Sequence, residues 1–153
     1  MLTILEVLQR TTAFFKEKQI ENARLNAELL LAHGLGLSKR MDLYMEFDRP
    51  LQESDLERVR PLVKRRVAGE PIQYIEGKAN FMGVNFMVDS RVLIPRPETE
   101  ELVERIGVRF EDESPQSILD LGTGSGAIAL SLARMFPEAG VVATDISAEA
   151  LAV

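Results

Sequence analysis

A glycine-rich turn between an apolar strand and an apolar helix limits the folds that this chain can adopt. Residues 117–121 read Ser-Ile-Leu-Asp-Leu, the next five read Gly-Thr-Gly-Ser-Gly, and apolar side chains follow at helical spacing over 127–135. Glycines adopt backbone angles that other residues avoid and let a ligand approach the main chain, and a helix that begins here offers free N–H groups. The pattern predicts a strand, turn and helix unit that can hold a ligand.

A second strand is predicted at 140–145, Gly-Val-Val-Ala-Thr-Asp, and it ends in an acid. Asp145 follows the glycines by about twenty residues, the distance at which a carboxylate reaches the ribose hydroxyls of a bound nucleotide. Ligands of parallel sheets bind at the carboxyl ends of the strands, so we expect the glycine loop and Asp145 to converge. Two readings without a ligand stay open, a tight turn for the glycines and a helix cap for Asp145.

Two classes of cofactor fit this unit. Gly122, Gly124 and Ala127 satisfy the dinucleotide fingerprint in its Gly/Ala form, which favours a nicotinamide or flavin cofactor. The competing ligand is S-adenosylmethionine, which has ribose and adenine but no pyrophosphate. Asp120, two residues before the first glycine, would repel a pyrophosphate but could pair with the ammonium group of a methionine moiety. Asp120 therefore favours the second class.

A small helical domain is predicted over residues 1–72. Thr3 and Glu6 have the spacing of a capping box, which begins a helix, and apolar residues recur after them. Three further helices are expected, at 22–35, at 38–44 with Ser38 as its cap, and at about 54–68 behind a second capping box formed by Ser54 and Glu57. Nothing in this domain demands catalysis, which suits a module for recognising a partner.

Residues 73–94 are predicted to form a β-hairpin linker, in which short apolar runs that begin at Tyr74 and Ile75 alternate with Gly and Asn. Pro95 and Pro97 then hold Arg96 on a stiff, extended segment. Pro97 suits the first turn of a helix that buries apolar residues, namely Leu102, Val103 and Ile106. For Arg96 both ligand binding and a surface salt bridge stay open.

The composition of the chain limits the kinds of catalytic and metal sites that it can form. The chain has 153 residues, a net charge of -6, no Cys and a single His. A zinc site, a Cys nucleophile and a Ser-His-Asp triad are therefore hard to build, and no metal is expected. The acidic net charge argues against electrostatic binding of nucleic acid over a broad surface. Without a signal peptide or a long apolar run, the protein is expected to be cytoplasmic and to make no membrane contact.

The quoted motifs, together with Gly69-Glu70-Pro71-Ile72-Gln73-Tyr74, Phe81-Met82-Gly83 and the segment Ile94-Pro95-Arg96-Pro97-Glu98-Thr99-Glu100, resemble the PrmC/HemK family over essentially the whole chain. This family consists of S-adenosylmethionine-dependent methyltransferases that modify the glutamine of the Gly-Gly-Gln loop in class I peptide chain release factors. The glycine motif alone indicates only a class I methyltransferase. The Pro-Arg-Pro-Glu-Thr segment is far more specific.

The resemblance implies a helical bundle at 1–72 that docks the release factor, the hairpin linker at 73–94, and the N-terminal part of a Rossmann-like domain at 95–153. It implies S-adenosylmethionine as the cofactor. The residues implied to bind it are Asp120, Gly122, Thr123, Gly124, Ser125, Gly126, Asp145 and Ile146. Those implied to lie near the cofactor or the substrate entrance are Arg96, Pro97, Glu98 and Thr99.

The family's catalytic Asn-Pro-Pro-Tyr motif is absent from these 153 residues, which contain no Pro-Pro pair. Only two parallel strands can be assigned, so we expect an N-terminal fragment without activity. The uncovered sheet of this fragment could self-associate, whereas the full-length family member is expected to be a monomer. Three alternatives stay open: a nucleic-acid base methyltransferase, a dinucleotide-dependent oxidoreductase, and an inactive module that binds release factors.

Overall fold

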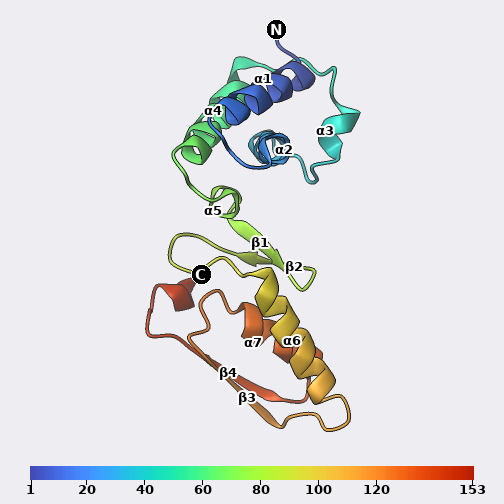
Figure 1. The fold of residues 1–153 in the computed structure, drawn as a ribbon, viewed down its shortest axis with the longest axis vertical. Coiled ribbons are helices and arrows are strands. Elements are labelled where there is room, and N and C mark those ends of the chain that lie inside the picture. The colour runs from blue at the N-terminus through green and yellow to red at the C-terminus, as the bar shows by residue number, and fades with distance from the viewer. The chain divides into compact units, whose positions relative to one another are not determined.

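The computed structural model describes residues 1–153, which divide into two compact units, Met1–Glu76 and Gly77–Val153 (Figure 1). The regular secondary structure of the first unit is helical, apart from one isolated β-bridge between Thr3 and Pro50. The second unit holds a β-hairpin and a pair of parallel strands with helices. No helix combines the length and the apolar composition that a membrane span requires.

The first unit has five helices: α1 (Ile4–Glu17), α2 (Ala23–Gly34), α3 (Asp42–Met45), α4 (Glu53–Val67) and α5 (Ile72–Glu76). Their apolar faces meet in one core, in which Ile4, Leu8, Phe15 and Leu30 are fully buried. Gly34 lets α2 approach α4 closely, because a Cβ there would lie 2.8 Å from the Val59 side chain. The predicted helical domain is thus observed as a closed bundle.

Helix α1 begins as the sequence predicts. The Thr3 N–H donates to the Glu6 carboxylate at 2.8 Å, and the Glu6 N–H donates to the Thr3 hydroxyl at 3.3 Å. These two bonds satisfy donors that a helix start otherwise leaves unpaired. The capping box at Thr3 and Glu6 is confirmed.

Two other predicted caps are wrong. Helix α3 begins at Asp42 with Met41 as its N-cap residue, so Ser38 does not cap it, and the Asp42 carboxylate accepts the Lys39 N–H at 2.9 Å. Helix α4 begins at Glu53, and Ser54 already lies inside it. Its N-cap residue is instead Gln52, whose N–H donates to the carboxylate of Asp55 at 3.0 Å. In both places an ionised carboxylate, which is a stronger acceptor than a hydroxyl, sits three residues after the N–H that it binds.

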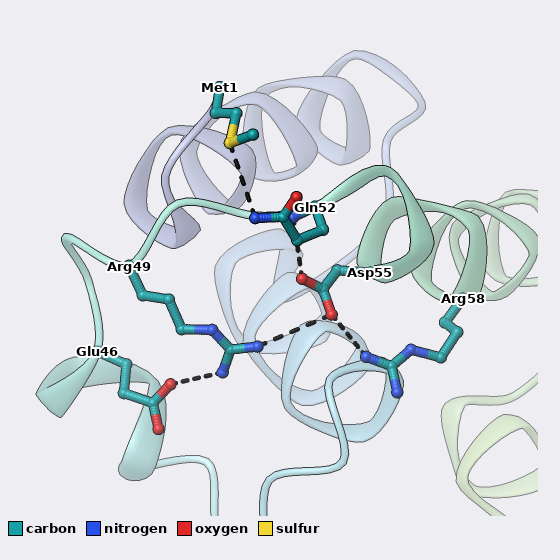
Figure 2. A network of polar contacts seen from close by, with 6 residues as sticks. All are labelled: Met1, Glu46, Arg49, Gln52, Asp55 and Arg58. Atoms are coloured by element: carbon teal, nitrogen blue, oxygen red, sulfur yellow. Dashed lines mark hydrogen bonds and ion pairs between the residues drawn. The ribbon is translucent and has the colours of Figure 1, made fainter.

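Asp55 also joins α4 to the preceding loop (Figure 2). Its carboxylate, almost fully buried, lies 2.6 Å from the Arg58 guanidinium and 3.8 Å from that of Arg49. Arg49 in turn binds Glu46 at 2.7 Å. The Gln52 N–H and the two guanidinium groups hold the pKa of Asp55 below its usual value.

The segment predicted as a hairpin over 73–94 divides in two. Tyr74 and Ile75 lie in α5, where their N–H groups donate to the Pro71 carbonyl, and Ile75 is buried in the helical core. The hairpin itself comprises β1 (Lys78–Phe81) and β2 (Val84–Met87). Proline at a helix start lacks only an N–H that would be unpaired there, so Pro71 suits a helical turn better than a strand.

The hairpin belongs to the core of the second unit rather than forming a separate linker. Phe81 and Phe86 are buried with their rings edge to face, 6.0 Å apart, and they pack with Val103 of α6 (Pro97–Arg109). Val103 is fully buried and Ile106 packs against the same core, as predicted, whereas Leu102 is half exposed. The prediction that Leu102 is buried is therefore wrong, because neighbouring residues of a helix face directions about 100° apart and Val103 takes the position toward the core.

The glycine-rich unit has the predicted elements: β3 (Ser117–Leu121), α7 (Ala127–Met135) and β4 (Gly140–Thr144), followed by the short 3-10 helix η1 (Ala150–Ala152). The strands are parallel and adjacent, with Ser117 opposite Gly140 and Leu121 opposite Thr144. Helix α7 packs against both strands, and α6 packs against α7 (Figure 1). The resemblance thus predicted the first part of a Rossmann-like fold correctly.

The sequence predicts an uncovered sheet, and one face of β3 and β4 is indeed open. Ile118, on the face toward α7, is partly buried, whereas Leu119 and Leu121 are 61% and 74% exposed. Val142 of β4 is 57% exposed on the same open face. Side chains alternate along a strand, and helices cover only one side of this pair.

Candidate cofactor site

The glycine loop is tied to the end of β4 through its backbone. The N–H groups of Gly122 and Thr123 donate to the Thr144 carbonyl at 2.8 and 2.9 Å, and the Gly126 N–H closes a turn on the Thr123 carbonyl at 2.9 Å. Gly122, Gly124 and Gly126 have φ angles of 77°, 56° and 75°. Residues with a Cβ rarely adopt this left-handed conformation, which accounts for three glycines in five residues.

The loop is also open on its outer side. A Cβ added at Gly122 or Gly124 would meet no atom within 4 Å, in contrast to Gly126, which faces Leu130 of α7. Packing within the chain therefore does not require glycine at the first two positions. Their open surface permits a ligand to approach the main chain, as the sequence predicts for a cofactor loop.

Asp145 lies directly against this loop. One carboxylate oxygen accepts the Gly124 N–H at 2.9 Å, and the other accepts the Ser147 N–H at 2.9 Å. These backbone donors, with that of Ser147 the stronger, lower the pKa of Asp145, so the group is ionised at neutral pH. The predicted convergence of the loop and Asp145 is therefore observed, and each carboxylate oxygen keeps acceptor capacity for another donor.

The alternative reading of Asp145 as a helix cap is only partly consistent with these contacts. The Ala150 N–H at the start of η1 donates to the Ser147 hydroxyl at 3.1 Å, not to Asp145. Asp145 instead orders the turn before η1 and holds the glycine loop. Ile146, next in the chain, is fully exposed.

Asp120 reaches the loop from the end of β3. One of its carboxylate oxygens accepts the Thr123 hydroxyl at 2.7 Å, and the other makes no hydrogen bond within the chain. The carboxylate is partly buried at the base of the loop. This position leaves one anionic oxygen for a cationic group of a ligand, and it would repel a pyrophosphate.

The segment from Arg96 to Thr99 forms the start of α6. Arg96 has the extended backbone that its two flanking prolines predict, with φ −105° and ψ 148°, and its carbonyl accepts the Thr99 N–H at 3.0 Å. Its side chain is exposed and makes no ion pair, so the surface salt bridge that the sequence left open is not formed. Arg96, Pro97, Glu98 and Thr99 make no hydrogen bond to the glycine loop.

Glu100 has a contact that sequence reasoning missed. Its carboxylate accepts the N–H of Met82 at 2.6 Å and so fixes the hairpin turn to the first turn of α6. Met82 has φ 50°, an uncommon conformation for a residue with a side chain. The sequence explains an acid at this position by the helix dipole alone, and it contains no signal for a partner eighteen residues away.

A cavity of about 540 Å³ lies between the hairpin and α7. Met82 and Phe86 line it from the hairpin, Leu130 and Arg134 line it from α7, and Ser125 of the glycine loop also borders it. Ser125 is the one predicted cofactor residue in its lining. The hairpin turn held by Glu100 and the glycine loop therefore border the same cavity.

Both units of the chain are similar to domains of known proteins. Residues 6–77 match the PrmC N-terminal domain, and residues 99–153 match the methyltransferase small domain. The chain is 49% identical over 154 aligned residues to a release factor glutamine methyltransferase of Chlorobaculum tepidum, which covers 97% of this chain and 52% of that protein. Proteins of the same description from Rhodopirellula baltica and Bacillus subtilis are 43% and 42% identical, over 97% and 100% of this chain.

The chain spans about half the length of the curated relatives that it matches. Within that half, the first match covers the helical bundle and the second covers α6 and the glycine-rich unit. Both domain matches and the relatives agree on this order of units, so the chain is similar to release factor glutamine methyltransferases over about half of their length.

Proposed function

We propose that the protein takes part in the S-adenosylmethionine-dependent methylation of a glutamine side-chain amide in the Gly-Gly-Gln loop of class I peptide chain release factors. The proposal is supported by relatives described as release factor glutamine methyltransferases and by the match of residues 99–153 to a methyltransferase domain. This chain would supply the helical docking unit and the first part of the cofactor site.

The observation that carries the proposal is the contact between the Gly124 N–H and the Asp145 carboxylate at 2.9 Å. It joins the glycine loop and the acid at the carboxyl ends of two adjacent parallel strands, the place where sheets of this kind bind nucleotides. The carboxylate is held there before any ligand arrives, so no rearrangement is needed to accept hydrogen bonds from two ribose hydroxyls.

The residues at the loop fit S-adenosylmethionine. The free oxygen of Asp120 suits the ammonium group of the methionine moiety, and the open main chain at Gly122 and Gly124 leaves space for that moiety to lie against the loop. Thr123 and Ser125 complete this loop, and the exposed Ile146 is proposed as a contact for the adenine ring. The cofactor would supply an electrophilic methyl group on a sulfonium.

The Arg96–Thr99 segment is proposed to border the cofactor or the entrance for the substrate. Its support is the exposed and unpaired guanidinium of Arg96, held on an extended segment between two prolines. A guanidinium without an internal partner keeps all five of its donors for a ligand or a protein substrate.

Methyl transfer also needs a group that activates the amide. An amide nitrogen is a poor nucleophile, because its lone pair is delocalised, so acceptors must orient its hydrogens and draw electron density toward it. The 153 residues contain no Pro-Pro pair and hence no Asn-Pro-Pro-Tyr motif. We therefore propose that this chain by itself transfers no methyl group and binds the cofactor weakly.

The test is a titration of the 153-residue chain with S-adenosylhomocysteine, followed by the amide NMR signals of residues 122–126, which detects weak binding. We expect these signals to shift, and an Asp145→Ala variant to require at least about tenfold more ligand, because a charge-assisted hydrogen bond to ribose is lost. Asp112→Ala, which removes an exposed acid of the same unit, is the matched control.

Equal shifts with NAD, or an unaltered titration of the Asp145 variant, would contradict the cofactor assignment. A methylation assay with a Gly-Gly-Gln release factor and the chain alone should give no product. Measurable turnover in that assay would show that the residues needed for activating the amide lie within these 153 residues.

A further inference from the structure

The helical unit carries a concavity of about 490 Å³ that is lined by basic side chains from three elements. Lys16 comes from α1, Arg24 from α2, and Arg40 from the loop before α3. Glu28 and Tyr44 form part of its wall. The lining has three cations and one carboxylate, in a chain whose net charge is -6.

Glu28 organises the two arginines. Its side chain is only 3% exposed. One carboxylate oxygen accepts the Nε–H of Arg24 at 2.5 Å and the Tyr44 hydroxyl at 2.6 Å, and the other accepts an Nη1–H of Arg40 at 2.8 Å. Burial alone would raise the pKa of Glu28, but the bonds from Tyr44 and Arg24 outweigh it and hold the pKa below its usual value. Glu28 is thus a fixed anion at the base of the concavity.

The remaining donors of the arginines are not used by Glu28. Arg24 binds it through Nε, and Arg40 binds it through one terminal nitrogen, so each guanidinium keeps further N–H groups. Their side chains are 44% and 41% exposed, and the exposed parts border the concavity. Two guanidinium groups on one carboxylate leave one positive charge uncompensated, and Lys16 adds a second.

We propose that this basic concavity binds carboxylate side chains of the protein that the helical unit docks. The inference rests on the proposed function for the presence of a protein substrate, and it adds the face and the chemistry of the contact. Carboxylates match the guanidinium donors in geometry, and an ordered pair of arginines loses little conformational entropy when it binds them. An acidic segment would also compensate the excess positive charge.

The experiment measures the affinity of the 153-residue chain for a hexaglutamate peptide and for a class I release factor, by calorimetry at two salt concentrations. We expect Arg40→Gln to weaken both by about tenfold and Lys16→Gln by about threefold, and higher salt to weaken both in the unaltered chain. Lys64→Gln, the same charge change on α4 outside the concavity, should stay within twofold.

Arg40→Gln removes a partner of buried Glu28 and can lower the stability of the fold, whereas Lys16 makes no bond to Glu28, so its variant keeps the test valid. Unchanged affinities for release factor in both variants would overturn the inference and leave the proposed function in place. Peptide binding without any release factor binding would overturn the proposed docking instead. Tighter binding of an RNA hexamer than of hexaglutamate would overturn the assignment to carboxylates.

Discussion

The two units differ in how completely each buries its apolar side chains. In Met1–Glu76, five helices surround one core, and the fully buried residues come from α1, α2, α3 and the segment before α4. In Gly77–Val153, helices α6 and α7 cover one face of the strand pair, while Leu119, Leu121 and Val142 stay exposed on the other. Apolar residues thus form a closed core in the first unit, although Phe14 and Leu25 stay exposed, whereas in the second unit they are covered only at alternate positions of the strands.

The largest loss of stability is expected when the same change, Leu to Ala, is made in the closed core rather than on the open face. Leu30→Ala removes a fully buried side chain of α2 and should cost about 2–5 kcal/mol of unfolding free energy, because it loses apolar burial and leaves a cavity. Leu121→Ala on the open face should cost less than about 0.5 kcal/mol. Tyrosine fluorescence in a denaturant titration follows the first unit alone, because Tyr44 and Tyr74 both lie in it.

Hydrogen exchange of peptides from residues 117–145 reports the second unit in the same samples. Leu121→Ala could speed hydrogen exchange in β3 and β4 as much as Leu30→Ala speeds it in the helices of the first unit. That result would show that the open face is covered in solution. The comparison between a closed and an open unit would then fail.

A second prediction concerns Glu100, which stabilises the second unit through a polar contact. Glu100→Ala should free the Met82 N–H and destabilise the hairpin turn by about 1.5–3 kcal/mol, the range for a hydrogen bond to a charged group. The amide of Met82 should exchange faster with solvent, while the amides of α1 keep their rates. Glu101→Ala, next to it and paired only with exposed Arg105, is the control and should change little.

The smallest expected effect is the acid sensitivity of the first unit. Because the pKa of Asp55 is lower in the folded chain than in the unfolded one, its stabilisation is complete above about pH 4 and is lost as pH falls through the folded value. Asp55→Asn should cost about 0.5–2 kcal/mol at neutral pH, the range for a helix cap, and should flatten stability below pH 4. Glu53→Gln, at an exposed position of the same turn, should keep the acid dependence of the unaltered chain.

Local signals in the sequence were most reliable where neighbouring residues make the contacts. The capping box of Thr3 and Glu6 and the bounds of α7 could be predicted, because the interacting groups lie within one helical turn. Ser38 and Ser54 have the same kind of signal, yet the carboxylates of Asp42 and Asp55 accept the N–H groups near these helix starts. A hydroxyl and a carboxylate compete for the same N–H groups, and spacing alone does not decide between them.

By itself, the sequence determined the order of the elements and the place of the cofactor loop, because strand periodicity, glycines and Asp145 lie in one stretch of thirty residues. The packing of the helices and the hairpin decided instead that Glu100 holds the turn at Met82 and that Glu28 binds both Arg24 and Arg40. These contacts join residues from different elements, and their partners depend on how the helices pack. Local propensity carries no information about such packing.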